Sequence, residues 1–194
     1  MIWQRDEFDT AIRTKKHYGP RIYPHEHNLE LNWDRFIKLY DTHPPQLVHG
    51  NVNKKNYGLH NFLDRGSTPK YLKNMSKALQ DIFYKNKVSL IAFGSWGCTA
   101  QSFNIHRDTM DVIYMQGLGE TNLSIWKEKV PMTVTVNNVD HGEKEKLDMV
   151  QKNKMKMHDT IWIPRGTFHL IEPINTRVSF SFGIEGDIDP STYI

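Results

Sequence analysis

The sequence predicts a mainly β protein with flanking helices. From residue 88 onward, short runs rich in β-branched and aromatic residues follow one another at a density typical of a β-sandwich or barrel. Helical periodicity is confined to the part before residue 88. The 194 residues suffice for one sizeable core that needs no disulfides. We therefore expect a single domain over residues 1–194, with a helical or irregular part at about 1–87 and a barrel core at about 88–184.

Each predicted strand is a short apolar or alternating run bounded by turn residues. In the barrel core these runs are 88–94, 101–106, 111–116, 121–126, 132–136, 149–156, 159–164, 168–172 and 177–183. One more strand is expected at 46–50. The polar, Lys-rich segment 137–156 is expected to be an exposed hairpin or loop.

Two amphipathic helices are predicted ahead of these strands. Asn32 can cap the first, which ends before Pro44-Pro45. Its apolar face holds Trp33, Phe36, Ile37 and Tyr40. The second helix is expected at 69–85, with Thr68 as its cap and Lys85-Asn86-Lys87 at its end, where positive charge suits the helix dipole. Its apolar stripe predicts packing on a sheet and consists of Tyr71, Leu72, Met75, Leu79, Ile82 and Phe83.

Composition restricts the partners and the compartment. The 25 Lys and Arg exceed the 22 Asp and Glu by only three, which does not indicate a nucleic-acid or membrane surface. Cys98 is the only cysteine, so an intramolecular disulfide is excluded. The N-terminus turns polar before an apolar signal segment could form, and no run of about 18 apolar residues occurs. We expect a cytoplasmic protein, with His25-Glu26-His27 as solvated surface.

Two short segments, whose first and last histidines lie 63 positions apart, carry the strongest functional signal. They are His106-Arg107-Asp108 and Pro164-Arg165-Gly166-Thr167-Phe168-His169. Two imidazoles and one carboxylate on adjoining strands can bind one divalent metal and leave its other face open, as in non-heme Fe(II) oxygenases. Taken singly, His106 could be a hydrogen-bonded core residue and Asp108 a turn residue. Together the segments favour His106, Asp108 and His169 as metal ligands.

The segment from Asp159 to His169 resembles the second motif of the cupins, in which a strand leads to Pro-x-Gly-x-x-His. The Pro and Gly form a turn that fixes the direction of the following histidine. His158 stands where that motif usually has glycine. A side chain is tolerated there only if the turn does not need a positive φ, or if His158 accepts the strain.

The first segment extends the resemblance to the cupin-like Jumonji C (JmjC) hydroxylases, particularly the ribosomal-oxygenase branch. His106-x-Asp108 is followed in register by Asp111-Val112, an apolar strand and Gln116-Gly117-x-Gly119, and the likeness spans about residues 88–184. The resemblance implies a double-stranded β-helix, the cupin or jelly-roll barrel. It also implies a dioxygenase that uses Fe(II), 2-oxoglutarate and O2 to hydroxylate a protein side chain or a small molecule.

The substrate and the assembly do not follow from the resemblance. The C-terminal dimerisation and winged-helix regions of ribosomal oxygenases are not recognised after the last predicted strand, so a ribosomal substrate cannot be inherited from the resemblance. The expected partner is an unidentified protein or small-molecule substrate, without nucleic acid or membrane, and a homodimer is allowed.

The family's basic anchor for 2-oxoglutarate is replaced here by Thr121, which cannot neutralise a carboxylate. Arg177 is the best substitute, because alternation places Arg177 and Ser179 on one face of their strand and phenylalanines on the other. We expect Arg177, helped by Thr121 or Ser179, to bind the distal carboxylate. The alternative is a surface arginine, and Lys127 is a weaker candidate. Tyr114 shares the parity of His106, so it either contacts cosubstrate or substrate or simply fills the barrel.

Two other functions remain open on the sequence. One is a non-catalytic cupin-like binding or assembly module that has lost cosubstrate binding, an alternative that Thr121 supports. The other is a cupin isomerase or hydrolase with Zn or Mn on the same three ligands.

Overall fold

The computed structural model describes residues 21–22, 31–42, 46–47, 56–59, 68–100, 103, 105–127, 138–139 and 148–186. Its helices are α2 (Trp33–Asp41) and α3 (Lys70–Ile82). Its strands are β1 (Arg21–Ile22), β2 (Gln46–Leu47), β3 (Asn56–Leu59), β4 (Lys87–Ser95), β5 (Ile105–His106), β6 (Asp111–Leu118), β7 (Thr121–Lys127), β8 (Asn138–Val139), β9 (Asp148–Met155), β10 (Asp159–Ile163), β11 (Phe168–Pro173) and β12 (Arg177–Glu185). Within these residues, no helix is both long and apolar enough to cross a membrane.

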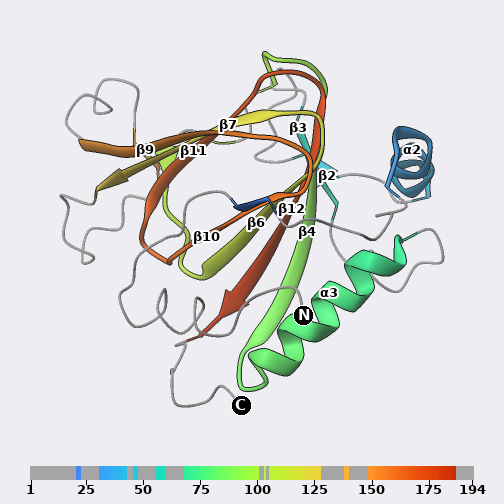
Figure 1. Cartoon of the computed structure of the whole chain (residues 1–194), viewed down its shortest axis with the longest axis horizontal. Helices are drawn as coiled ribbons and strands as arrows, with labels where there is room; N and C mark the ends of the chain where they lie inside the picture. The colour runs from blue at the N-terminus through green and yellow to red at the C-terminus, as the bar shows by residue number, and fades with distance from the viewer. Residues whose placement is uncertain are drawn as a thin grey trace.

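The strands form two antiparallel sheets (Figure 1). One sheet has the order β1-β10-β6-β12-β4-β3-β2, and the other has the order β8-β5-β11-β7-β9. A buried apolar cluster joins them, because Tyr114 and Ile161 of the first sheet pack with Leu123 and Met155 of the second. The mainly β fold with flanking helices predicted from the sequence is therefore confirmed.

Most predicted strands are found within one or two residues of their expected bounds, which is the usual uncertainty of strand ends. Those at 88–94, 111–116, 121–126, 149–156, 159–164, 168–172 and 177–183 correspond to β4, β6, β7, β9, β10, β11 and β12. Of the strands predicted at 46–50 and 101–106, the structure describes a strand only over β2 and β5, respectively. The predictions at 132–136 and at His25-Glu26-His27 lie outside the described residues. The short strands β1, β3 and β8 were not predicted, because two to four residues in polar surroundings give too short a pattern to indicate a strand.

The helices are found where periodicity placed them, but the ends of the second helix differ from the prediction. Asn32 does cap α2, since its Oδ1 accepts a hydrogen bond from the backbone N–H of Arg35 at 2.8 Å. Thr68 does not cap α3, because Pro69 has an extended ψ of 132° and takes the cap position without a side-chain bond. The helix also ends at Ile82 rather than near Lys85, and Phe83 leaves the helical conformation.

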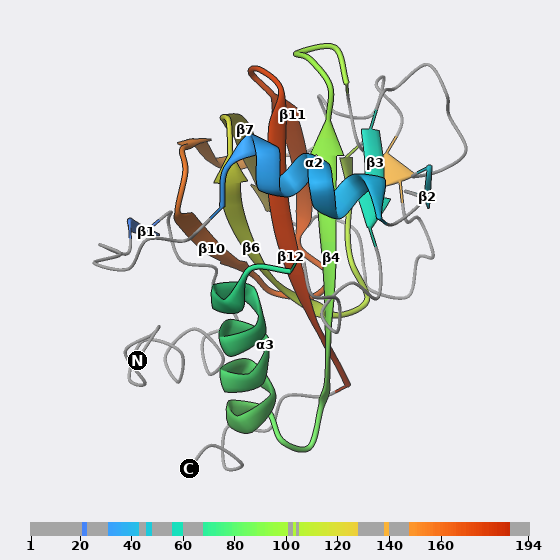
Figure 2. The same cartoon turned by 90° about the vertical axis from the view of Figure 1, so that its right-hand side faces the viewer.

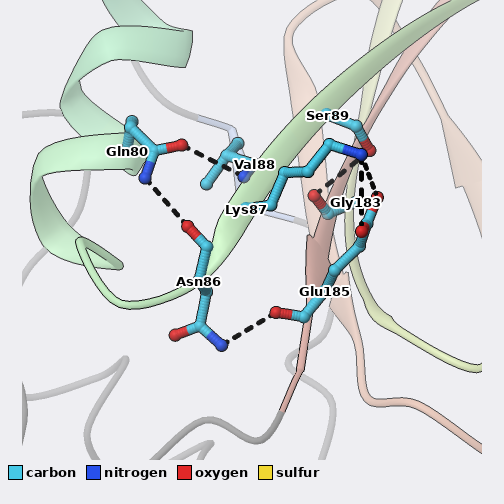
Figure 3. Close-up of polar contacts among 7 residues, drawn as sticks. All are labelled: Gln80, Asn86, Lys87, Val88, Ser89, Gly183 and Glu185. Carbon is cyan, nitrogen blue, oxygen red and sulfur yellow. Dashed lines mark hydrogen bonds and ion pairs between the residues drawn. The ribbon is translucent and has the colours of Figure 1, made fainter.

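The end of α3 is set by side chains that join it to the sheet (Figure 3). Gln80 donates to the carbonyl of Asn86 at 2.8 Å and accepts from the N–H of Val88 at 3.1 Å, which closes the turn into β4. Asn86 then donates to the carbonyl of Glu185 at 2.9 Å, and Lys87 forms an ion pair with the Glu185 carboxylate. The chain therefore turns toward β12 before the predicted helix end.

Both helices cover the outer face of the seven-stranded sheet; α2 crosses in front of β12 and β4, and α3 lies beside the lower part of these strands (Figure 2). Leu72, Met75 and Leu79 of α3 are fully buried against this face. The apolar side of β12 points the same way, since Phe180 and Phe182 belong to the same cluster. This leaves the other face of the sheet, including Arg177, for the interior of the barrel.

Leu79→Ala should lower the free energy of unfolding by about 2–5 kcal/mol, as truncations of other buried leucines do. Leu79 has no exposed surface, so its removal leaves a cavity between α3 and the sheet. Urea denaturation measures the change. Ile37 of α2 was predicted on the apolar face, but it is 44% exposed, and Leu39 is buried instead. Ile37 serves as a control whose replacement by Ala should change stability by only about 0.5 kcal/mol. A similarly small effect at Leu79 would contradict the packing of α3.

The turn between β9 and β10 forces His158 into the left-handed region, at φ 76°. The N–H of Asp159 donates to the carbonyl of Lys156 at 2.9 Å, so His158 occupies the third position of a four-residue turn, where type II turns require a positive φ. The sequence left open whether this turn needs a positive φ, and it does. The strain explains why the related motif has glycine there.

His158→Gly should therefore raise the free energy of unfolding by about 0.5–1 kcal/mol, because relief of the strained φ exceeds the added freedom of the unfolded chain. The urea midpoint measures this gain. His158→Ala keeps the Cβ and should give no gain, which separates the backbone effect from loss of the imidazole.

Candidate metal centre

His106, Asp108 and His169 come together at one end of the smaller sheet. His106 on β5 and His169 on β11 are directly paired across the two strands. Nε2 of His106 lies 3.8 Å from one Asp108 carboxylate oxygen, and Nε2 of His169 lies 3.5 Å from the other. One ligand atom from each residue lies within 4.8 Å of the others, so a single ion can contact all three.

A tight turn positions His169. The N–H of Thr167 donates to the carbonyl of Pro164 at 3.1 Å, and Gly166 between them has a φ of 76°, which glycine adopts without strain. Nδ1 of His169 lies 3.0 Å from the carbonyl oxygen of Thr167. Since a carbonyl only accepts hydrogen bonds, Nδ1 carries the proton and Nε2 keeps its lone pair for a metal.

The two ligand-bearing segments are also bound directly to each other. The N–H of Gly166 donates to the carbonyl of Asp108 at 2.9 Å. Asp111 accepts from the N–H of Arg165 at 3.2 Å, and its other oxygen lies 3.7 Å from Nε of Arg165. These hydrogen bonds fix the position of His169 relative to Asp108 and do not depend on a bound metal ion.

The donor set suits a divalent transition metal. Ligand atoms bound at roughly 2.0–2.2 Å to one ion lie roughly 3–4 Å apart, close to the separations found here. Two imidazoles and one carboxylate form the facial triad of non-heme iron sites, and the same donors also serve zinc. The three predicted ligands are thus brought together in a suitable geometry.

A cavity of about 170 Å³ opens beside the three ligands. Its floor is buried and includes Val112, Tyr114, Ile163 and Arg177. Toward solvent it is lined by half-buried side chains of β4, β12 and the segment before β6. The Asp108 side chain is 33% exposed and that of His169 only 3%, so the candidate metal centre lies between the floor and the opening.

Arg177 is buried in this floor and is only 1% exposed. Its Nη1 donates to the hydroxyl of Ser179, while its Nε has no hydrogen-bond partner among the described residues. No described carboxylate forms an ion pair with it. Burial lowers the pKa of the guanidinium, and its interaction with Tyr114 opposes this shift. A buried, uncompensated cation is costly, so Arg177 is suited to bind an anion that enters the cavity.

Behind the floor, Gln116 fixes the direction of two hydroxyl groups. Its amide nitrogen donates to the carbonyls of Leu118 at 2.7 Å and Val178 at 3.3 Å, so Oε1 must face the other way. There it accepts from Tyr114 at 2.7 Å and from Thr121 at 3.0 Å. Each hydroxyl has one hydrogen, and both are directed to Gln116.

The remaining predicted site residues are distributed unevenly around the cavity. Tyr114 and Arg177 line it, whereas Thr121 and Ser179 are fully buried behind it. The side chain of Lys127 lies outside the described residues. Sequence reasoning missed the role of Gln116, although it shares the parity of Tyr114 on one strand. It also missed Asp111, whose partner Arg165 is 54 residues away.

Comparison with known proteins identifies the family. The JmjC domain model matches residues 72–188, which is more than half of the chain. The chain belongs to the JmjC domain family. The match includes most of helix α3 and all three candidate ligands of this JmjC domain. Sequence comparison with curated proteins finds no match.

Solved structures of similar fold include the ribosomal oxygenase YcfD of Escherichia coli. Its complex with cobalt and 2-oxoglutarate superposes with a TM-score of 0.52 at 16% identity, covering 68% of this chain and 32% of that chain. Another crystal structure of YcfD gives a TM-score of 0.52 at 16% identity and covers 70% and 33%. The chain thus spans about a third of the length of YcfD. This likeness shows that the JmjC domain has the predicted jelly-roll fold.

Proposed function

We propose that this JmjC domain is an Fe(II)- and 2-oxoglutarate-dependent oxygenase that hydroxylates its substrate. One observation carries the proposal: a buried arginine without a counter-charge among the described residues shares a cavity of about 170 Å³ with a group of two histidines and one aspartate. In this proposal, the arginine in the floor of the cavity binds a carboxylate, and the two histidines and the aspartate above it bind a metal. Cobalt and 2-oxoglutarate in the YcfD complex are consistent with it.

In this proposal Nε2 of His106, Nε2 of His169 and the Asp108 carboxylate hold the iron. Iron and 2-oxoglutarate, when bound, supply the oxidising chemistry: O2 and 2-oxoglutarate give succinate, carbon dioxide and one hydroxyl group on the substrate. The protein holds the metal on one face, orients the cosubstrate and keeps water from the buried floor. The apolar side chains of Val112 and Ile163, at most 6% exposed, serve that last role.

Arg177 binds the distal carboxylate of 2-oxoglutarate. A guanidinium neutralises the carboxylate and offers it parallel N–H donors, which a hydroxyl at position 121 cannot do. Ser179 accepts from Nη1 of Arg177 and keeps its own hydrogen, so it can hold the guanidinium and donate onward. Thr121 directs its hydrogen to Gln116 and acts indirectly, by fixing the wall behind Tyr114.

The competing functions are less well supported by the cavity. The non-catalytic module was favoured by the lack of a cation at Thr121. Arg177, however, offers a cation in the cavity that the three candidate ligands also line. The donor set alone does not exclude zinc or manganese. A hydrolase or isomerase, however, gives no reason for a buried arginine that forms no ion pair with any described carboxylate and lies close to the metal ligands.

Anaerobic titration tests the proposal. We expect the protein to bind one equivalent of Fe(II) and then one of 2-oxoglutarate, with the visible charge-transfer absorption of a chelated 2-oxo acid. In air, 2-oxoglutarate should be converted to succinate with Fe(II) and not with Zn(II). Iron binding without any binding of 2-oxoglutarate would refute the oxygenase and favour the binding module.

A further inference from the structure

The opening of the cavity has a lining distinct from that of its floor. We define the mouth as six half-buried side chains that line the cavity: Ser89, Ile91, Phe93, Phe103, Met110 and Ser181. Four of them are apolar and two are hydroxyls. On β4 the alternate residues are fully buried under the helices, so the partial exposure of Ile91 and Phe93 comes from the cavity side.

An aromatic wall leads from the mouth to the metal ligands. The rings of Phe93 and Phe103 meet edge to face, with centroids 6.2 Å apart and planes at 80°. The ring of Phe103 then lies 4.7 Å from the imidazole of His106 at a tilt of 34°. An apolar group that slides along Phe93 and Phe103 therefore arrives directly beside a candidate metal ligand.

The charges in the cavity already have roles. Among the described lining residues, only Asp108 and Arg177 carry a formal charge, and the proposed function assigns them to the metal and to 2-oxoglutarate. A charged substrate group at the mouth would exchange hydration for contact with Ile91, Phe93, Phe103 and Met110. Such a transfer is costly without a partner, whereas burial of hydrocarbon is favourable.

The space also limits the size of that group. The volume of the cavity, about 170 Å³, is smaller than the roughly 300–1,000 Å³ of sites that enclose drug-sized ligands. Bound 2-oxoglutarate would occupy part of this volume. The cavity wall is tightly packed at Gly183, because a Cβ at this position would overlap Sδ of Met110 and lie 2.9 Å from Oγ of Ser89. Met110 and Ser89 therefore pack directly against the backbone of Gly183, and the small volume of the cavity suits one group of side-chain size.

From these observations we infer the substrate class of the proposed oxygenase. The group that is oxidised is an uncharged hydrocarbon side chain, presented by a larger molecule that stays outside the mouth. This inference rests on the proposed function, because it takes Asp108 and Arg177 as occupied by metal and cosubstrate.

The test uses amide-capped amino acids that differ mainly in charge. N-acetyl-norleucine methylamide is compared with N-acetyl-lysine methylamide, and the leucine probe with the aspartate probe. Each is added to the anaerobic complex of the full chain with Fe(II) and 2-oxoglutarate, and the shift of the visible absorption gives its dissociation constant. We expect the uncharged member of each pair to bind about tenfold or more tightly, and to stimulate 2-oxoglutarate consumption in air.

A charge placed at the mouth should reverse this preference. In Ile91→Glu, and independently in Met110→Glu, the lysine probe should bind more tightly than the norleucine probe, while Ile91→Leu keeps the parental order. Circular dichroism verifies the folding of each variant. If both glutamate variants are misfolded, the probe comparison on the parent protein decides alone.

The outcomes separate this inference from the proposed function. An absorption band with 2-oxoglutarate that responds equally to charged and uncharged probes, or only to charged ones, overturns the substrate class and leaves the oxygenase intact. If no band forms before any probe is added, both proposals fail. A larger response to norleucine and leucine supports the inference.

Discussion

His169→Ala should abolish stoichiometric Fe(II) binding while leaving the β-fold largely intact. The variant keeps His106 and Asp108, but two donors cannot complete the facial arrangement of three ligands. Among the described residues, no fourth His, Cys, Asp or Glu belongs to this group, so none of them stands ready to replace His169. Isothermal titration with Fe(II) under anaerobic conditions measures the loss.

The matched control is His158→Ala, which removes an imidazole from the turn between β9 and β10 and not from the cavity. It should bind iron as the parent does. Equal iron affinity in His169→Ala and the parent would remove His169 from the metal centre, provided that circular dichroism shows both proteins folded.

Arg177→Met should raise the dissociation constant of 2-oxoglutarate by about tenfold to a thousandfold, corresponding to about 1.4–4 kcal/mol. Methionine keeps much of the side-chain volume and removes the charge that we assign to the distal carboxylate. Iron binding should change little. The ligand-free variant should be at least as stable as the parent, because an uncompensated buried cation has been replaced by an apolar group.

Two comparisons make this prediction specific. Lys127→Met removes a cation that the sequence also offered, and it should weaken 2-oxoglutarate binding much less. Ser179→Ala should weaken binding more than Thr121→Val, because only Ser179 contacts Arg177. Normal decarboxylation of 2-oxoglutarate by Arg177→Met would reject Arg177 as the anchor.

The parts of the protein that the sequence could predict are those fixed by local pattern. His106 and Asp108 lie two residues apart, and His169 follows a turn whose Pro and Gly are visible in the sequence, so the candidate ligands could be named individually. The alternation of Arg177 and Ser179 with Phe180 and Phe182 likewise predicted which face meets the helices, and the burial of both faces agrees.

The parts that could not be predicted depend on contacts between distant residues. The end of α3 is decided by Gln80 and by the contact between Asn86 and Glu185, which are 99 residues apart. Gln116 fixes two hydroxyls because the carbonyl of Val178 is 62 residues away along the chain. Phe103 reaches His106 through ring packing that no spacing rule encodes. Each of these features appears only when strands are brought side by side.

The alternation of β12 also limits which changes of chain length this strand can accept. It pairs with β4 over nine successive positions without a break, whereas its pairing with β6 shifts register between Val178 and Ser179. A one-residue slip of the whole strand would turn the guanidinium toward the helices and the phenylalanine rings toward the metal ligands. A point substitution in β12 changes one side chain, whereas an insertion that makes the strand slip by one residue exchanges the side chains of its two faces. Homologues should therefore vary in the identity of residues along β12 but keep its length.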